Sequence, residues 1–321
     1  MGDFLLYLFY VLTWLMYLTL LASLICWLRL LPAIWRQGLR GFVESWVTVR
    51  LRTRPFWGIA ELLIMFGSMM VIGQLVLLVA IENDWMPRPD PSTGALEQTA
   101  NGIFVALCAS CVANLAAVII TLIWMRNIDR DAVRKLGMVF DLDSVRLGLK
   151  ASVMILPPVL LIAVAADFLR PYEHPVLDVL ADLKSPEVFT VIFIGTAILT
   201  PVFEEMFFRG LLQGSLQGVA DRARGSVDEP AGLSVSDEQH SAANLASDDA
   251  WRPVAYWPLI AASLVFALMH LGQGAAPIPL FFLSLGLGYL YRQTGSLVPC
   301  IVVHMILNGM TLVVEFMRPT L

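Results

Sequence analysis

The chain has 321 residues, of which 58% are hydrophobic and 15% charged, and its mean hydropathy is +0.74. A soluble protein of this length needs far more charged surface, so the composition excludes an ordinary soluble globular protein and predicts an integral membrane protein. The formal net charge of −5 argues against a nucleic-acid partner.

Long apolar runs, each a candidate membrane helix, follow one another along the whole chain. We count eight, at about residues 4–28, 58–80, 102–125, 151–168, 188–218, 254–271, 277–291 and 298–317. They predict an all-α polytopic membrane protein of about eight transmembrane helices, kinked or discontinuous around an intramembrane cavity. The fifth run is too long for one straight crossing, and Pro201 is its expected break.

Basic residues are concentrated in alternate connections between these runs. Arginine and lysine gather after the first run and after the third, whereas residues 81–101 and 169–187 are mainly acidic. The positive-inside rule then places both termini outside and the 219–253 connection inside.

One long polar segment interrupts the second half of the chain. Residues 225–250 carry acidic but no basic side chains and almost no large apolar ones, so we expect a disordered acidic insert. We therefore divide the chain into N-terminal transmembrane helices with basic loops, residues 1–187, and a functional core, residues 188–317, that contains the insert.

A few polar and ionisable side chains lie inside the last four apolar runs, where they are costly and therefore candidates for function. They are Glu204, Glu205, Arg209, His270, His304 and Asn308. In "PVFEEMFFRG", Glu205 and Arg209 are four residues apart and share a helix face, which predicts a structural ion pair. Glu204 is turned by about 100° from Glu205 and remains free to face a cavity.

The later polar residues repeat the same four-residue spacing. "FALMH" places Phe266 one turn before His270, and "HMILN" places His304 one turn before Asn308. A carboxylate beside a histidine can activate water as a general base. A histidine and an amide presented together can donate hydrogen bonds to the oxyanion that forms when water attacks an amide carbonyl. The pattern therefore favours peptide hydrolysis without a serine or cysteine nucleophile.

Glu-Glu-x-x-x-Arg, Phe-x-x-x-His and His-x-x-x-Asn, in this order on successive apolar runs, resemble the CPBP intramembrane protease family. That family includes CAAX prenyl endopeptidases and bacterial abortive-infection and bacteriocin-processing proteins. The resemblance covers about residues 188–317. It implies an intramembrane endopeptidase that acts on a membrane-anchored or hydrophobic peptide, in a bilayer that we expect to be a bacterial plasma membrane.

The resemblance also implies roles for the polar residues. Glu204 and His270 would activate water, His304 and Asn308 would stabilise the oxyanion, and Glu205 with Arg209 would support them. Because the family has also been described as metal-dependent, Glu204, His270 and His304 are a candidate zinc-ligand set with an open fourth position. No His-Glu-x-x-His helix requires a metal, and the metal-free glutamate mechanism is slightly favoured over zinc.

Two other functions use the same residues. A carboxylate alternating with histidines is also the pattern of a proton or ion relay in a transporter, and a catalytically idle member would be a binding or immunity scaffold.

The sequence also predicts how deep each polar residue lies in the membrane. Glu204 and His304 fall in the cytoplasmic half, but His270 falls too far outward unless the sixth helix is tilted or begins late, near Pro258.

Overall fold

A computed structural model describes residues 2–88, 100–170, 185–223 and 250–317. Almost all of the described chain is α-helical, and the only strands in it are the two-residue β1 and β2, which pair antiparallel. Six described helices are long and apolar enough to cross a membrane. The protein is therefore an all-α polytopic membrane protein, as predicted.

The elements follow the predicted runs closely. In chain order they are α1 (Gly2–Trp46), β1 (Arg52–Thr53), α2 (Ile59–Glu82), α3 (Ala100–Ile128), α4 (Ala132–Lys135), α5 (Leu142–Asp167), α7 (Pro186–Ile192), η1 (Phe193–Leu199), α8 (Thr200–Glu205), η2 (Met206–Gln213), α9 (Gly214–Ala223), β2 (Ala250–Trp251), α11 (Trp257–Leu268), α12 (Pro277–Thr294) and α13 (Val298–Met317). The six candidate spans leave out α11 and α12, so the count of about eight crossings stays a prediction. The acidic insert lies outside the described residues except for Ala250 in β2.

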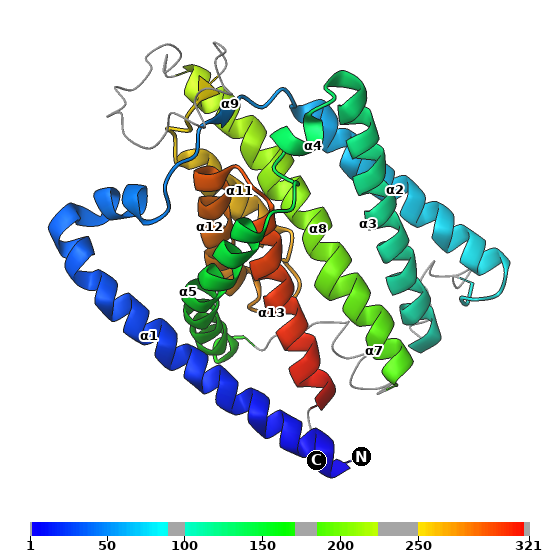
Figure 1. Cartoon of the computed structure of the whole chain (residues 1–321). Helices are drawn as coiled ribbons and strands as arrows, with labels where there is room; N and C mark the ends of the chain where they lie inside the picture. Colours follow the sequence, from blue (N-terminus) through cyan, green and yellow to red (C-terminus); the bar gives the residue numbers. More distant parts are fainter. Residues whose placement is uncertain (1, 89–99, 171–184, 224–249, 318–321) are drawn as a thin grey trace.

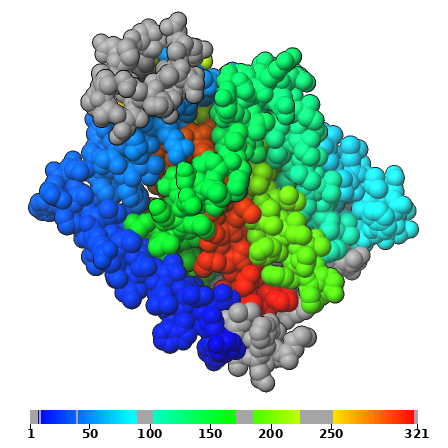
Figure 2. Space-filling view, in the orientation of Figure 1, coloured from blue at the N-terminus to red at the C-terminus, as the bar shows by residue number. Residues whose placement is uncertain are grey.

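The helices alternate in direction between two ends of the molecule (Figure 1). The start of α1 and the end of α13 lie at one end, and the basic connections after α1 and α3 lie at the other, beside the end of α9. α1 forms one flank and the α2–α3 hairpin the other. On the face shown in Figure 2, α13 lies between α5 and the helix that starts at Pro186. The basic connections therefore lie at the end opposite to the start of α1 and the end of α13, as predicted. Which end faces the cytoplasm stays a prediction.

The fifth run forms one continuous helical rod from Pro186 to Ala223, although Pro201 was expected to break it. Two stretches of π-helix, η1 and η2, flank the short α8 that carries both glutamates. In the wider π register the N–H of Thr200 donates to the carbonyl of Gly195. Pro201 follows in the first turn of α8, where its missing N–H does not interrupt the rod. Single-turn π segments are often found at functional sites.

The N-terminal part of the chain holds this rod in place. The indole N–H of Trp57, just before α2, donates to the carbonyl of Gly210 in η2 at 2.9 Å. The Ser215 hydroxyl contacts the carbonyl of Trp57 in return, at 3.5 Å. Trp57 is buried, and a side chain at Gly214 would meet its ring at 3.0 Å. The helix that bears Glu204 is therefore anchored from outside the core predicted at residues 188–317.

Candidate active site

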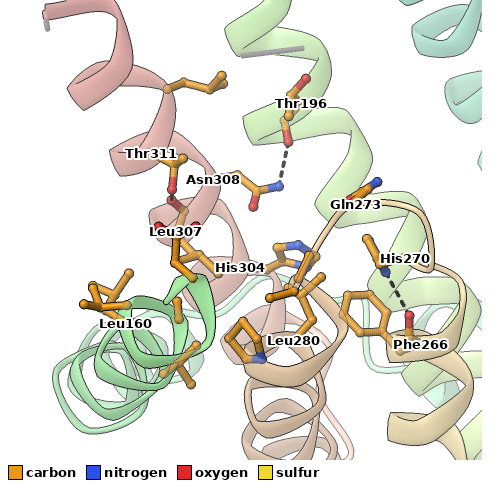
Figure 3. A pocket seen from close by; sticks show the side chains of 18 of the residues that line it. Leu160, Thr196, Phe266, His270, Gln273, Leu280, His304, Leu307, Asn308 and Thr311 are labelled. Atoms are coloured by element: carbon orange, nitrogen blue, oxygen red, sulfur yellow. Dashed lines mark hydrogen bonds between the residues drawn. The ribbon is translucent and has the colours of Figure 1, made fainter. Parts of the chain in front are cut away.

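A cavity of about 450 Å³ lies between α5, the Pro186–Ala223 rod, α12 and α13 (Figure 3). Its walls are mainly apolar, with Val159, Leu160, Leu280 and Leu307 among them. The polar side chains that line it include Glu204, His270, Gln273, His304 and Asn308. All four residues predicted to be catalytic therefore border one space, although they come from three separate stretches of the chain.

The two adjacent glutamates have different surroundings, as the helix geometry predicted. Glu205 is fully buried and forms an ion pair with buried Arg209, with Nε and Oε2 3.1 Å apart. Glu204 remains partly exposed at the cavity wall. The change to π-helix directly after Glu205 does not prevent the pairing with Arg209.

His304 lies between the two carboxylates. Its Nδ1 is 2.7 Å from Oε1 of Glu205, and its Nε2 is 3.6 Å from Oε2 of Glu204. Because a carboxylate accepts, the short contact places a proton on Nδ1, which donates to Glu205. The sequence did not predict this bond, because the two residues are 99 positions apart and no local spacing connects them. Glu205 therefore orients the imidazole in addition to pairing with Arg209.

Arg209 joins the glutamate pair to α12 and α11. Its Nη2 donates to the Ser284 hydroxyl at 3.0 Å, and its guanidinium lies 4.7 Å from the centre of the Phe266 ring. Although Nε of Arg209 is within ion-pair distance of Glu205 Oε2, that oxygen and Nη1 of Arg209 have no hydrogen-bond partner. The contact is therefore mainly electrostatic, and a buried charge pair of this kind depends on both partners.

His270 extends into the cavity from the end of α11. Its Nδ1 is 2.8 Å from the carbonyl of Phe266, and because a carbonyl only accepts, Nδ1 carries the proton. A neutral His270 then has its free lone pair on Nε2. The ring of Phe266 also packs against the rings of His270 and His304, with centroids 4.8 and 6.1 Å away. Phe266, which the sequence placed one turn before His270, thus packs against both imidazoles.

A late start of α11 explains the depth of His270. The helix begins at Trp257, with Pro258 in its first turn, and ends at Leu268. Its 12 residues span about 18 Å, well short of the roughly 30 Å of a hydrocarbon core. The residue that appeared too far outward therefore reaches the same cavity as Glu204 and His304.

Asn308 binds a backbone carbonyl that the π-helix leaves available. Its Nδ2 donates to the carbonyl of Thr196 at 3.0 Å (Figure 3). The N–H of Thr200 donates to the carbonyl of Gly195. The next residue, Pro201, has no N–H that could donate to the carbonyl of Thr196. The bond fixes the orientation of the amide, so that one N–H remains for another acceptor.

The predicted zinc set does not fit this arrangement. Within the described residues, no three His, Cys, Asp or Glu side chains are placed so that they could hold one metal ion. His304 has Nδ1 engaged by Glu205, and His270 has Nδ1 engaged by a carbonyl, which leaves one nitrogen on each ring. Glu204, His270 and His304 share the cavity without converging on one point, so we derive no step through a metal.

Comparison with known families agrees with the motifs. The family model described as "Type II CAAX prenyl endopeptidase Rce1-like" matches residues 186–310. The matched stretch contains Glu204, Glu205, Arg209, His270, His304 and Asn308. No curated protein and no solved structure matches the chain.

Proposed function

We propose that this chain, whose residues 186–310 match the family model of type II CAAX prenyl endopeptidases, is an intramembrane endopeptidase with its reaction centre in the described cavity. One observation carries the proposal. A partly exposed carboxylate, two histidines and an amide border a single cavity, and the carboxylate faces a histidine that a second carboxylate orients. This is the set of groups that water-mediated amide hydrolysis requires.

Water activation is the first step. The Glu204 carboxylate takes a proton from a water molecule in the cavity, and the free Nε2 of His270 accepts a hydrogen bond from the same water. The oxygen of that water attacks the carbonyl carbon of the substrate. A positioned carboxylate of this kind typically contributes about 10²- to 10⁴-fold to the rate.

The tetrahedral oxyanion forms next. His304, with both ring nitrogens protonated, donates from Nε2, while Nδ1–H continues to donate to Glu205. Asn308 donates from the N–H that Thr196 does not use. Breakdown of the intermediate breaks the C–N bond, and protonated Glu204 returns its proton to the leaving amine. Glu205 and Arg209 do not react, but they hold the imidazole against movement.

The proposed substrate is a membrane-associated peptide of the CAAX-like type, with a lipid-modified terminus. An apolar cavity wall suits such a chain, because it shields hydrophobic groups beside the scissile bond. With the basic connections on the cytoplasmic side, the centre would lie in the cytoplasmic half of a bacterial plasma membrane. Residues 188–317 would supply the reaction centre and residues 1–187 its scaffold.

The direct test is cleavage of a farnesylated CAAX peptide by the purified full chain in liposomes. We expect cleavage by the wild type and by the control Glu82→Gln, whose side chain is exposed at the end of α2. Glu204→Gln, His270→Ala and His304→Ala should each lose it. Wild-type cleavage by all three variants would end the proposal, and Glu204-dependent proton flux without cleavage would favour a relay instead.

A further inference from the structure

The connection between α11 and α12, residues 269–276, follows an unusually short apolar helix. Because α11 is only about 18 Å long, shorter than the roughly 30 Å of a hydrocarbon core, we expect this connection to lie at membrane depth. Non-helical backbone is tolerated there only where it is buried in protein or lines a wet cavity. The connection lines the cavity through His270, Gln273, Ala275 and Ala276.

Two glycines set the shape of this connection. Gly272 has φ 101° and Gly274 has φ 59°, on either side of Gln273. Side chains rarely accept such values, whereas glycine does. A Cβ on Gly272 would meet nothing within 4 Å, so backbone conformation and not space calls for glycine there. Figure 3 shows the Gln273 side chain among the residues that line the cavity.

Two polar groups of the connection are left for a ligand. Oε1 of Gln273 is buried without a hydrogen bond. The N–H of Ala275, a buried residue of the cavity wall, donates to no backbone carbonyl among the described residues. A buried group left in this state costs about 1–3 kcal/mol. Such an arrangement calls for a ligand that offers both donors and acceptors.

We infer that Gln273 and the backbone around it bind the main chain of the substrate, as an extended peptide segment beside the scissile bond. This inference rests on the proposed peptidase function. Oε1 of Gln273 accepts a substrate N–H, and Nε2 donates to a substrate carbonyl, because one amide can pair with both groups of a peptide unit. Backbone pairing of this type gives affinity, while pockets for side chains give selectivity.

The test compares Gln273→Leu with the wild type on the farnesylated CAAX peptide and on an analogue with an ester in place of one amide beside the scissile bond. Gln273→Leu should raise KM about tenfold, as expected for the loss of a hydrogen bond, with kcat changed less than threefold. The ester should raise KM for the wild type but add nothing in Gln273→Leu. The matched control, Gln74→Leu, changes an exposed amide of α2 that does not line the cavity.

The outcomes separate this site from the proposed reaction. Cleavage by the wild type with an unchanged KM in Gln273→Leu, or an undiminished ester effect in that variant, overturns the binding site alone. No cleavage by the wild type overturns the peptidase and the binding site together. If Gln273→Leu unfolds, Gln273→Glu serves instead, because it keeps the size and the accepting oxygen. It should raise KM through loss of the donor.

Discussion

Two buried regions each place a glutamate in an apolar helix, and they differ in what surrounds it. In the α2–α3 hairpin, Oε2 of Glu61 accepts the N–H of Gly58 at 2.8 Å, and Oε1 accepts the indole N–H of Trp124 at 3.3 Å. In the cavity, Glu204 faces His304 at 3.6 Å and keeps access to open space. Both oxygens of Glu61 are thus used to hold the start of α2, whereas Glu204 is available to a substrate or to water.

The contrast shows how an intramembrane carboxylate should be interpreted. Its cost in an apolar helix makes it a candidate for function by default. Glu61 is not such a candidate, because its two oxygens already accept hydrogen bonds from the Gly58 N–H and the Trp124 indole. The partners of each carboxylate also distinguish the two adjacent glutamates. Glu205 is paired with Arg209 and orients His304, whereas Glu204 faces the cavity.

The largest expected effect contrasts Glu204 with Glu61. Glu204→Gln should lower kcat by about 10²- to 10⁴-fold and leave the unfolding temperature within a few degrees of the wild type. Glu61→Gln should keep cleavage within about threefold and lower stability by about 1–3 kcal/mol, because it disturbs buried hydrogen bonds. Peptide cleavage and thermal unfolding in detergent measure both. A large loss of activity in Glu61→Gln would remove the distinction.

The buried ion pair should be the most sensitive point for stability. Arg209→Met leaves Glu205 charged without its partner, and we expect a loss of about 3–5 kcal/mol in the free energy of unfolding. Replacing both, as Glu205→Gln with Arg209→Met, should cost less than Arg209→Met alone. Denaturant unfolding in mixed micelles measures the three variants. A double variant less stable than either single one contradicts the ion-pair account.

Asn308 should affect the reaction more than the fold. Asn308→Ala removes a proposed oxyanion donor and should lower kcat about 10²- to 10³-fold with little change in KM. Asn308→Asp keeps the shape but replaces the amide donor, so it should be equally impaired. Steady-state kinetics on the CAAX peptide give both constants. A raised KM with an unchanged kcat would assign Asn308 to substrate binding instead.

Pro201 offers a smaller and more specific change. Pro201→Ala restores an N–H that can donate to the carbonyl of Thr196 and so competes with Asn308. We expect kcat to fall about three- to tenfold, equivalent to the weakening of one hydrogen bond, and stability to stay the same or rise. Kinetics and thermal unfolding measured together distinguish this effect from damage to the helix. The double variant Pro201→Ala with Asn308→Ala should have the same kcat as Asn308→Ala alone.

The smallest effect lies outside the apolar segments, at the end of the α2–α3 hairpin. A hydrogen bond from Lys135 lowers the pKa of Asp129 below its ordinary value of 3.8. The stabilisation is therefore fully present above about pH 4 and is lost as pH falls through the lowered value. Lys135→Met should cost at most about 1 kcal/mol at neutral pH and less as the pH falls below 4. Unfolding midpoints at a series of pH values give the comparison.

The sequence by itself determined the class of protein and the identity of the polar set. Apolar runs separated by basic connections specify membrane helices, because the bilayer leaves few alternatives to them. The four-residue spacings identified the Glu205–Arg209 pair and the family, since helix periodicity is local. These features need only neighbouring residues, so no tertiary information was required.

Only the tertiary structure decided which groups meet. The bond between Glu205 and His304, the use of Asn308 by the carbonyl of Thr196 and the cavity wall at Gln273 join residues far apart in the chain. The late start of α11 sets the depth of His270, and the π register on both sides of α8 sets the direction of Glu204. Helix periodicity cannot predict these contacts, because they depend on how whole helices pack and where each one stops.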